Sequence, residues 1–508
     1  MGRDWRDARI VEQDARIAEQ ETRIAEQESR ITEQQARITY LETQLAERDQ
    51  VIARLLERIT KLEEQLRQSS QNSSKPPSSD SPWLLRGAKK KPSGRKPGGQ
   101  PGHRKHKRNL LPPERVNETH DEWPERCENC QHDLSTETRL EVGEAVRHQV
   151  IELPELRAHV AEYRLHTRYC PHCQWATPAA VPQGVSTSCF GPRLQAVVAV
   201  CSGVYRLTKR TVVSMLGDLF DVEMALGSVT ACEQRTSQVL AAPVQEARHY
   251  VEQQPVAYAD ETGWREARKR AWIWVAVTHW VTVFLVHARR NAEAAQQLLG
   301  RFQGVLVTDR WSAYLGWPLS ARQLCWAHLL RYFKAFAECK GAAKPIGDKL
   351  VALTKDIFRR WHRVRDGTLA RSTFRADMRP VRAEVERLLE EGSHCGHPKV
   401  EATCRDILTL APALWTFLRV VGVEPTNNAA ERALRWCVLM RKISFGTHSA
   451  SGSRFIERML TVAATMKQQG RNVVDYVTEA CEQSLQGRPA PSLLPSKDVH
   501  DRALRPAA

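Results

Sequence analysis

The sequence predicts a multidomain protein with an N-terminal α-helical coiled coil, a small four-cysteine zinc-binding module, and an α/β core with a helical insertion. Three observations lead to this prediction. A heptad repeat fills the first 68 residues, two Cys-x-x-Cys pairs follow it, and apolar strand-like runs beyond residue 255 lead into acidic residues. With 508 residues, of which 42% are hydrophobic, the chain is long enough for several domains.

The heptad repeat predicts a dimerising coiled coil over residues 1–68. Its d positions are mostly Gln in the first half and mostly Leu from Leu41 onward, so the second half should supply most of the stability. Ile at a with Leu at d favours a parallel dimer, and a single solvated helix is the weaker alternative. The nine consecutive a positions are Ile10, Ile17, Ile24, Ile31, Ile38, Leu45, Ile52, Ile59 and Leu66.

The net charge of +16 favours a polyanionic partner, most simply nucleic acid. Residues 1–68 carry 12 basic and 15 acidic residues, so the surplus lies elsewhere. Within the linker of residues 69–113, ten Lys and Arg fall between residues 86 and 108 without any acid. This pattern is typical of a flexible arm that contacts DNA phosphates, although a solvated basic linker is the alternative. The candidate contacts are Lys89, Lys90, Lys91, Arg95, Lys96, Arg104, Lys105, Lys107 and Arg108.

Residues 114–185 are predicted to form a structural zinc module. Two Cys-x-x-Cys turns would complete a tetrahedral site, although the 39 residues between them exceed the usual spacing. The runs 145–153 and 157–168 resemble strands of a long hairpin. His132 or His172 could replace one thiolate, and a redox dithiol is the alternative. The predicted ligands are Cys127, Cys130, Cys170 and Cys173.

Residues 186–252 are predicted to be mostly helical. A helix over 208–220, a turn, and a second helix with Ser228 as its N-cap fit a DNA-binding helix-turn-helix. Generic helical packing fits the same pattern equally well.

The chain then changes to short apolar runs that we interpret as strands of an α/β sheet. Asp260 and Asp309 each follow such a run, and carboxylates at strand ends can hold a divalent cation. The uncharged stretch 271–288 reaches the minimum length for a membrane helix, but its composition fits two paired strands better. The predicted strands are 256–259, 271–278, 281–287, 304–308 and 322–325.

A third acid, Glu431, lies at the start of a predicted helix. Taken alone, Asn428-x-x-Glu431 reads as a capping box. The whole order of strand, Asp260, antiparallel pair, strand, Asp309, helices and Glu431 instead resembles an RNase H-like core with a DDE triad. Because 122 residues separate Asp309 from Glu431, residues 336–425 are predicted to be a helical insertion with amphipathic runs at 349–365 and 378–391.

Nearly the whole chain resembles transposases of the insertion sequence 66 family. The resemblance rests on the two Cys pairs and on motifs in the same order: SSKPPSSD (73–80), GGQPGH (98–103), ADETGW (259–264), TDRWSAY (308–314), CWAH (325–328), NNAAERALR (427–435) and RKISFGTHSASG (441–452). It implies a DDE triad of Asp260, Asp309 and Glu431 holding Mg²⁺ or Mn²⁺, with core segments 253–335 and 426–477 before a tail at 478–508.

The resemblance also implies the chemistry and partners. Water would free a 3′-hydroxyl at the transposon end, and that hydroxyl would attack target DNA. The protein would act on end and target DNA as a homodimer or higher multimer, and accessory proteins of the same element could take part. Without a secretory signal or a disulfide pattern, the expected location is the cytoplasm, at the nucleoid.

Other residues near the acids have open roles. Glu261 is the rival ligand to Asp260, but in a strand it would point to the opposite face. Cys325 and His328 are auxiliary candidates, and Arg432 and Arg435 are candidate phosphate contacts. Trp311, Tyr314 and Trp326 fit core packing better than base stacking. A non-catalytic zinc-module regulator and an RNase H-like nuclease without strand transfer are the alternative functions.

Overall fold

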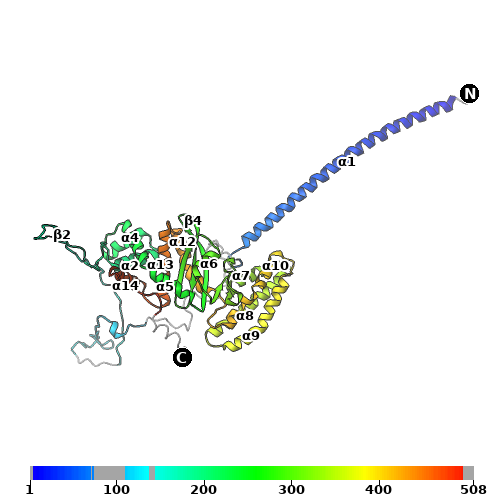
Figure 1. The fold of residues 1–508 in the computed structure, drawn as a ribbon. Helices are drawn as coiled ribbons and strands as arrows, with labels where there is room; N and C mark the ends of the chain where they lie inside the picture. The colour runs from blue at the N-terminus through cyan, green and yellow to red at the C-terminus, as the bar shows by residue number, and fades with distance from the viewer. Residues whose placement is uncertain (1–3, 70, 74–108, 137–142, 496–508) are drawn as a thin grey trace. The chain divides into compact units, whose positions relative to one another are not determined.

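The computed structural model describes residues 4–69, 71–73, 109–136 and 143–495 (Figure 1). The chain divides into two compact units: residues 1–85 with 328–408, and residues 86–327 with 409–508. The predicted insertion overlaps the second segment of the first unit. Among the described helices, none combines the length and apolar character needed to cross a membrane, and the uncharged stretch 271–288 forms two strands, as predicted.

The first unit begins with one continuous helix, α1 (Asp4–Arg67). Its apolar a-position side chains stay about half exposed, as Ile31 (60%) and Ile52 (53%) illustrate. The helix is therefore confirmed, and its partner in a coiled coil stays a prediction.

The inserted helices bury one apolar face each. Trp361 of α8 packs on Phe374 of α9 with ring centroids 5.8 Å apart, and Arg360 bridges the carboxylates of Asp356 (2.9 Å) and Asp377 (2.6 Å). Both predicted amphipathic runs are thus helical. The helices of this segment are α7 (Trp326–Ala337), α8 (Ala343–Arg365), α9 (Arg371–Gly392) and α10 (Pro398–Thr409).

The second unit contains a short two-stranded hairpin and a helical layer ahead of its central sheet. Helices α2, α3 and α4 enclose a small core around Val198, Leu216 and Cys232. The Thr208 hydroxyl caps α3, but α4 begins at Leu226, so the predicted Ser228 cap is wrong. These elements are β1 (Thr167–Tyr169), β2 (Ala176–Pro178), α2 (Pro192–Gly203), α3 (Lys209–Phe220), α4 (Leu226–Val239) and α5 (Ala241–Glu252).

A five-stranded mixed sheet forms the centre of this unit, in the order β5-β4-β3-β6-β7. Strands β5, β4 and β3 are antiparallel neighbours, whereas β6 and β7 run parallel to β3. The predicted strands are confirmed, but β3 continues well beyond Asp260, so this acid lies inside a strand and not at its end. The strands are β3 (Val256–Glu266), β4 (Lys269–Val277), β5 (Thr282–His287), β6 (Val305–Thr308) and β7 (Arg322–Leu324).

Helices pack on both faces of the sheet (Figure 1). Helix α12 packs on β3 and β4, α13 runs beside β5, and α6 covers the opposite face. Helix α14 crosses the predicted boundary at 477, and Leu493 is fully buried, so the predicted tail is partly core. The remaining helices are α6 (Ala292–Leu299), α11 (Thr416–Arg419), α12 (Asn428–Ser444), α13 (Ala450–Gln468) and α14 (Val473–Leu485).

Side chains of neighbouring helices bond backbone groups of both edge strands of the sheet. Three residues of α13, spaced four apart, accept from successive outward N–H groups of β5: Thr465 from Thr282 (3.2 Å), Thr461 from Phe284 (3.1 Å) and Glu457 from Val286. The spacing works because four helical residues advance about 6 Å and two strand residues about 6.6 Å. On the other edge, the Thr416 hydroxyl donates to the Arg322 carbonyl of β7.

Candidate active site

The register of two parallel strands brings the first two predicted acids together. In β3 and β6, Val256 lies opposite Val305 and Tyr258 opposite Val307. If the same register continues for two more residues, Asp260 lies opposite Asp309. Their backbone segments are then about 4.8 Å apart, the usual spacing of neighbouring strands. Asp309 immediately follows β6, and one of its carboxylate oxygens accepts from the Trp311 N–H at 2.8 Å.

The third acid, Glu431, lies in the first turn of α12, and its N–H donates to the carbonyl of Asn427. Asn427 is the N-cap, and its side chain makes no capping bond. The capping-box interpretation of Asn428 and Glu431 is therefore wrong, because the helix begins one residue earlier than that motif requires.

Asn427 is a positioning residue that the sequence did not single out. Its side-chain amide donates to the Ala259 carbonyl at 2.8 Å, and its backbone N–H donates to the Cys325 thiol at 3.2 Å. The start of α12 is thereby fixed to β3 next to Asp260 and to the end of β7. A buried Asn directly ahead of the helix that carries a predicted catalytic acid is the signal that could have identified it.

The charges of the other two predicted acids act on Asp260. Burial raises the pKa of Asp260 well above its usual range, and the negative charges of Glu261, Asp309 and Glu431 raise it further. The free energy cost of ionising Asp260 would fall if a cation were bound nearby. A cluster of carboxylate oxygens is the donor set that hard divalent cations prefer.

Glu261 points to the opposite face of β3, as the strand alternation predicted. Its carboxylate accepts from the Tyr314 hydroxyl at 2.6 Å and pairs with Arg290 at 2.6 Å. Burial is the main cause that raises the pKa of Glu261 to about 7, and the negative charge of Asp309 adds to the shift. The positive charge of Arg290 opposes it. Arg290 also stacks on Trp311, 3.8 Å from the ring centroid, so a buried ionic network supports the segment that follows Asp309.

The auxiliary and aromatic candidates belong largely to the interior. Cys325 is buried, and its backbone N–H donates to the Thr308 carbonyl at 2.8 Å. His328 is half-buried in the first turn of α7. Tyr314 and Trp326 are fully buried, and the Trp326 indole donates to the Leu414 carbonyl at 2.9 Å, which confirms core packing.

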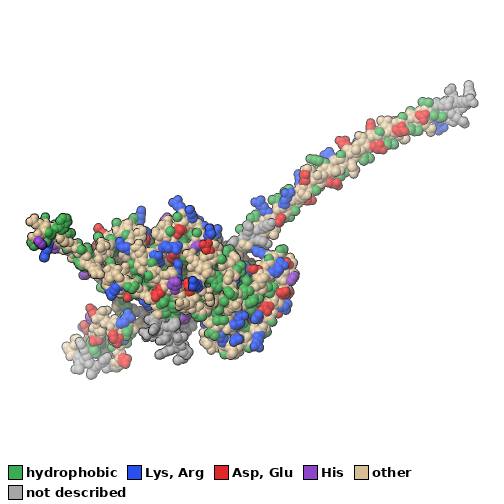
Figure 2. All heavy atoms as spheres, viewed as in Figure 1, with side chains coloured by type: hydrophobic (Ala, Val, Ile, Leu, Met, Phe, Trp, Pro, Cys, Tyr) green, Lys and Arg blue, Asp and Glu red, His purple; other side chains and the backbone are tan. Residues whose placement is uncertain are grey.

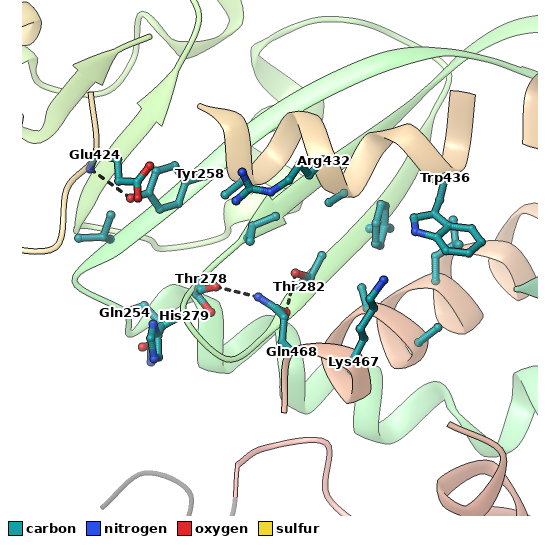
Figure 3. Close-up of a pocket in the computed structure, with 18 of the residues that line it drawn as sticks. Gln254, Tyr258, Thr278, His279, Thr282, Glu424, Arg432, Trp436, Lys467 and Gln468 are labelled. Carbon is teal, nitrogen blue, oxygen red and sulfur yellow. Dashed lines mark hydrogen bonds between the residues drawn. The ribbon is translucent and has the colours of Figure 1, made fainter. Parts of the chain in front are cut away.

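A groove of about 800 Å³ lies between the sheet and helices α12 and α13 (Figure 3). Tyr258, two residues before Asp260 in β3, and Arg432, next to Glu431 in α12, both line it. Trp436 and Lys467 line it further along, with the Lys467 ammonium 6.0 Å from the Trp436 ring centroid. Arg432 therefore faces the groove, whereas Arg435 is exposed on α12 and does not line it.

Both Cys-x-x-Cys pairs fold into the same tight turn. The Cys127 N–H donates to the His132 carbonyl (2.9 Å) and the Cys170 N–H to the Trp175 carbonyl (3.0 Å). Hydrogen bonds from backbone N–H groups within each turn, foremost those of Cys130 and Cys173, lower the pKa of the Cys127 and Cys170 thiols. Such turns suit thiolates that bind a metal.

The two cysteine turns do not come together as one ligand set in the described residues. The predicted strands 145–153 and 157–168 are also wrong, except for the last two residues of the second run, which belong to β1. Strand β1 instead pairs with β2 across the second cysteine turn. The predicted basic arm, including Lys89–Lys91 and Arg104–Arg108, lies outside the described residues.

Comparison with known proteins identifies the family. Residues 187–454, more than half of the chain, match the family described as "Transposase IS66 family", so the chain belongs to this transposase family. Residues 8–109 match a family of unknown function, DUF6444. The uncharacterized protein y4qI of Sinorhizobium fredii is 28% identical over 218 residues, which make up 40% of this chain and 40% of that protein. The match thus spans well under two thirds of that relative.

Proposed function

We propose that this chain is a DDE transposase that cleaves the 3′ ends of an insertion sequence and joins them to target DNA. The main support for this proposal is the position of Asp260. It lies on the central strand of a mixed sheet, where the negative charges of Asp309 and Glu431 raise its pKa. The sheet order, with three antiparallel strands followed by two parallel ones, supports an RNase H-like core. Membership of the transposase family supports DNA as the substrate.

The three carboxylates of Asp260, Asp309 and Glu431 would hold divalent metal, either Mg²⁺ or Mn²⁺. The fit rests on the raised pKa of Asp260, since a cation would offset the repulsion among these carboxylates. When bound, the metal would stabilise the charge on the attacking and leaving oxygens of a phosphodiester. The Asn427 side chain would keep Glu431 in register with Asp260, and the Trp311 N–H would orient the Asp309 carboxylate.

The groove beside the acids would hold one strand of the substrate. Arg432 and Lys467 supply positive charge, and Tyr258 and Trp436 supply aromatic faces. A strand in this groove would bring its phosphodiester past the catalytic acids. The helices α3 and α4 and the basic arm remain candidates for recognising the end sequence.

A cleavage assay tests this proposal. Purified protein with labelled end DNA and Mg²⁺ or Mn²⁺ should release a 3′-hydroxyl end and then join it to a target duplex. The Glu431→Gln variant should bind the DNA but lose both steps. Cleavage of RNA in hybrids without joining would identify a nuclease, and DNA binding without any cleavage would identify a regulator; either result contradicts the proposal.

We also propose that the two cysteine turns share one structural zinc ion. Metal analysis of the purified chain should find about one zinc per chain. The Cys127→Ser/Cys130→Ser variant should lose it, while the exposed Cys189→Ser change should not. If the parent protein holds well under one zinc per chain, the shared site is wrong.

A further inference from the structure

Strands β3 and β4 extend beyond the acids as a hairpin that carries an unusual density of positive charge. Arg265, Arg268, Lys269 and Arg270 are all exposed, and in the described part of the chain none of them lies within ion-pair distance of a carboxylate. Arg265 lies directly opposite Arg270 in the strand register. Like charges in that position repel each other, so this pair weakens the hairpin.

The turn of this hairpin is also costly. Ala267 and Arg268 both adopt left-handed backbone conformations, with φ of 49° and 65°. Two-residue turns of this type normally use Asn-Gly or Asp-Gly, because Gly lacks a β-carbon and Asn and Asp tolerate the left-handed conformation better than Ala or Arg does. The hairpin thus has two local features that disfavour it, and both involve arginine. Such features are expected where residues are retained for function and not for stability.

The arginines surround a recess of about 370 Å³. Arg265, Arg268, Arg270 and Arg441 line it together with Trp264 and Trp272, and no acid lines it. The Arg270 guanidinium lies 5.0 Å from the Trp272 ring centroid, which holds that side chain extended over the aromatic face. Figure 2 shows Lys and Arg side chains gathered on the surface near the end of the sheet where Figure 1 labels β4.

The hairpin is held in place by the loop after α12. The Thr447 N–H donates to the Arg265 carbonyl and the Ala267 N–H donates to the Thr447 carbonyl, both at 2.9 Å, and the Trp264 indole donates to the Thr447 hydroxyl at 3.3 Å. Gly446 touches the Arg265 carbonyl so closely that a β-carbon would clash. The arginines therefore stand on a fixed support, which lowers the entropy cost of binding an anion.

We propose that this arginine hairpin binds the phosphate backbone of the DNA duplex beside the catalytic acids. The inference rests on the proposed transposase function, since it requires the same DNA on the same strand β3. Glu266 lies six positions after Asp260, and at about 3.3 Å per residue this distance is about 20 Å. At about 3.4 Å per base pair, the contacted phosphates lie about six nucleotides from the cleaved bond when the duplex runs along β3.

The test uses the full chain with Arg268→Gly/Arg270→Gln and measures DNA affinity between about 50 and 200 mM salt. Each lost phosphate contact removes about 0.9 from the slope of log affinity against log salt, so the slope should fall by about 1.8. The matched control is Arg301→Ala/Arg488→Ala, which removes two exposed arginines elsewhere and should leave the slope unchanged. Because Arg268→Gly relieves the left-handed strain and Arg270→Gln removes the repulsion with Arg265, the thermal midpoint should not fall.

A second measurement locates the contact. Neutral methylphosphonate linkages placed one at a time along end DNA should weaken binding of the parent protein near the sixth nucleotide, and this effect should vanish in the hairpin variant. An unchanged salt slope, or the same linkage pattern in both proteins, overturns the proposal. If the slope and the pattern change but the parent protein cleaves no DNA, the hairpin contact stands and the catalytic proposal fails.

Discussion

The Asp260→Asn variant is expected to unfold at a higher temperature than the parent protein when divalent metal is removed. Burial and three neighbouring carboxylates raise the pKa of Asp260, so the ionised form destabilises the folded state. The folded state then binds more protons than the unfolded state, and parent stability falls as pH rises from the unfolded value of 3.8 through the raised one. Asparagine removes this cost and keeps the acceptor for the Glu261 N–H.

At a pH above the raised pKa of Asp260, the thermal unfolding midpoint of the variant should exceed that of the parent protein. The difference should be roughly 2–4 °C for each kcal/mol of repulsion removed. Added Mg²⁺ should reverse the order, because ligand that binds only the folded parent stabilises it in proportion to RT ln(1 + [L]/Kd). Differential scanning fluorimetry with chelator and with Mg²⁺ measures both effects. Asp366→Asn is the control, since hydrogen bonds from Thr368 lower that pKa and no gain is expected. Equal Mg²⁺ shifts in parent and variant would argue against metal at Asp260.

The Ile52→Glu/Ile59→Glu variant is expected to sediment as a monomer, whereas the parent chain sediments as a dimer or larger multimer. Both residues occupy a positions of α1, and each is about half exposed on the single helix, so their burial needs a partner helix. Loss of a large apolar side chain from a packed core costs about 2–5 kcal/mol, and a buried unpaired carboxylate adds to that.

Sedimentation velocity of the full-length proteins measures this change, and circular dichroism checks that helix content away from α1 is retained. Ala53→Glu/Thr60→Glu adds the same charge at the neighbouring b positions, which lie off the seam, and should leave the mass unchanged. Equal masses for the Ile variant and the parent would show that another surface holds the multimer together.

The core strands could be predicted from the sequence because buried strands are runs of apolar residues, and the acids could be predicted from their places beside those runs. Strand β6 is an apolar run that leads directly into Asp309. Strand β5 and the part of β4 from Ala271 onward carry no acidic side chain, Lys or Arg, because both are almost entirely buried. Strand β3 was harder to predict, because only its first residues are apolar. Its last residues, Arg265 and Glu266, pair with β4 outside the core, and their turn lacks the usual Asn-Gly signal.

The placement of Glu431 shows a different limit. A capping box and a catalytic acid produce the same local pattern, so the residues around Asn428 alone could not decide between them. In the structure the Asn427 side chain bonds Ala259 of β3, a contact that spans 168 residues of sequence, and makes no capping bond in α12. The cysteine turns likewise could be predicted as turns from their spacing. Of the chain between them, the described residues form a strand only at Thr167–Tyr169, so the longer strands predicted there were wrong.

The covered edges of the sheet also bear on how several copies can gather on one DNA. A bare edge strand offers a row of amide groups to any neighbouring chain, and crowded proteins with such edges polymerise or exchange strands. In this chain, α13 occupies the outward amides of β5, and Thr416 occupies a carbonyl of β7. Copies of the sheet therefore have little means of joining strand to strand along β5, and the proposed multimer would have to form through another surface, such as the predicted seam of α1.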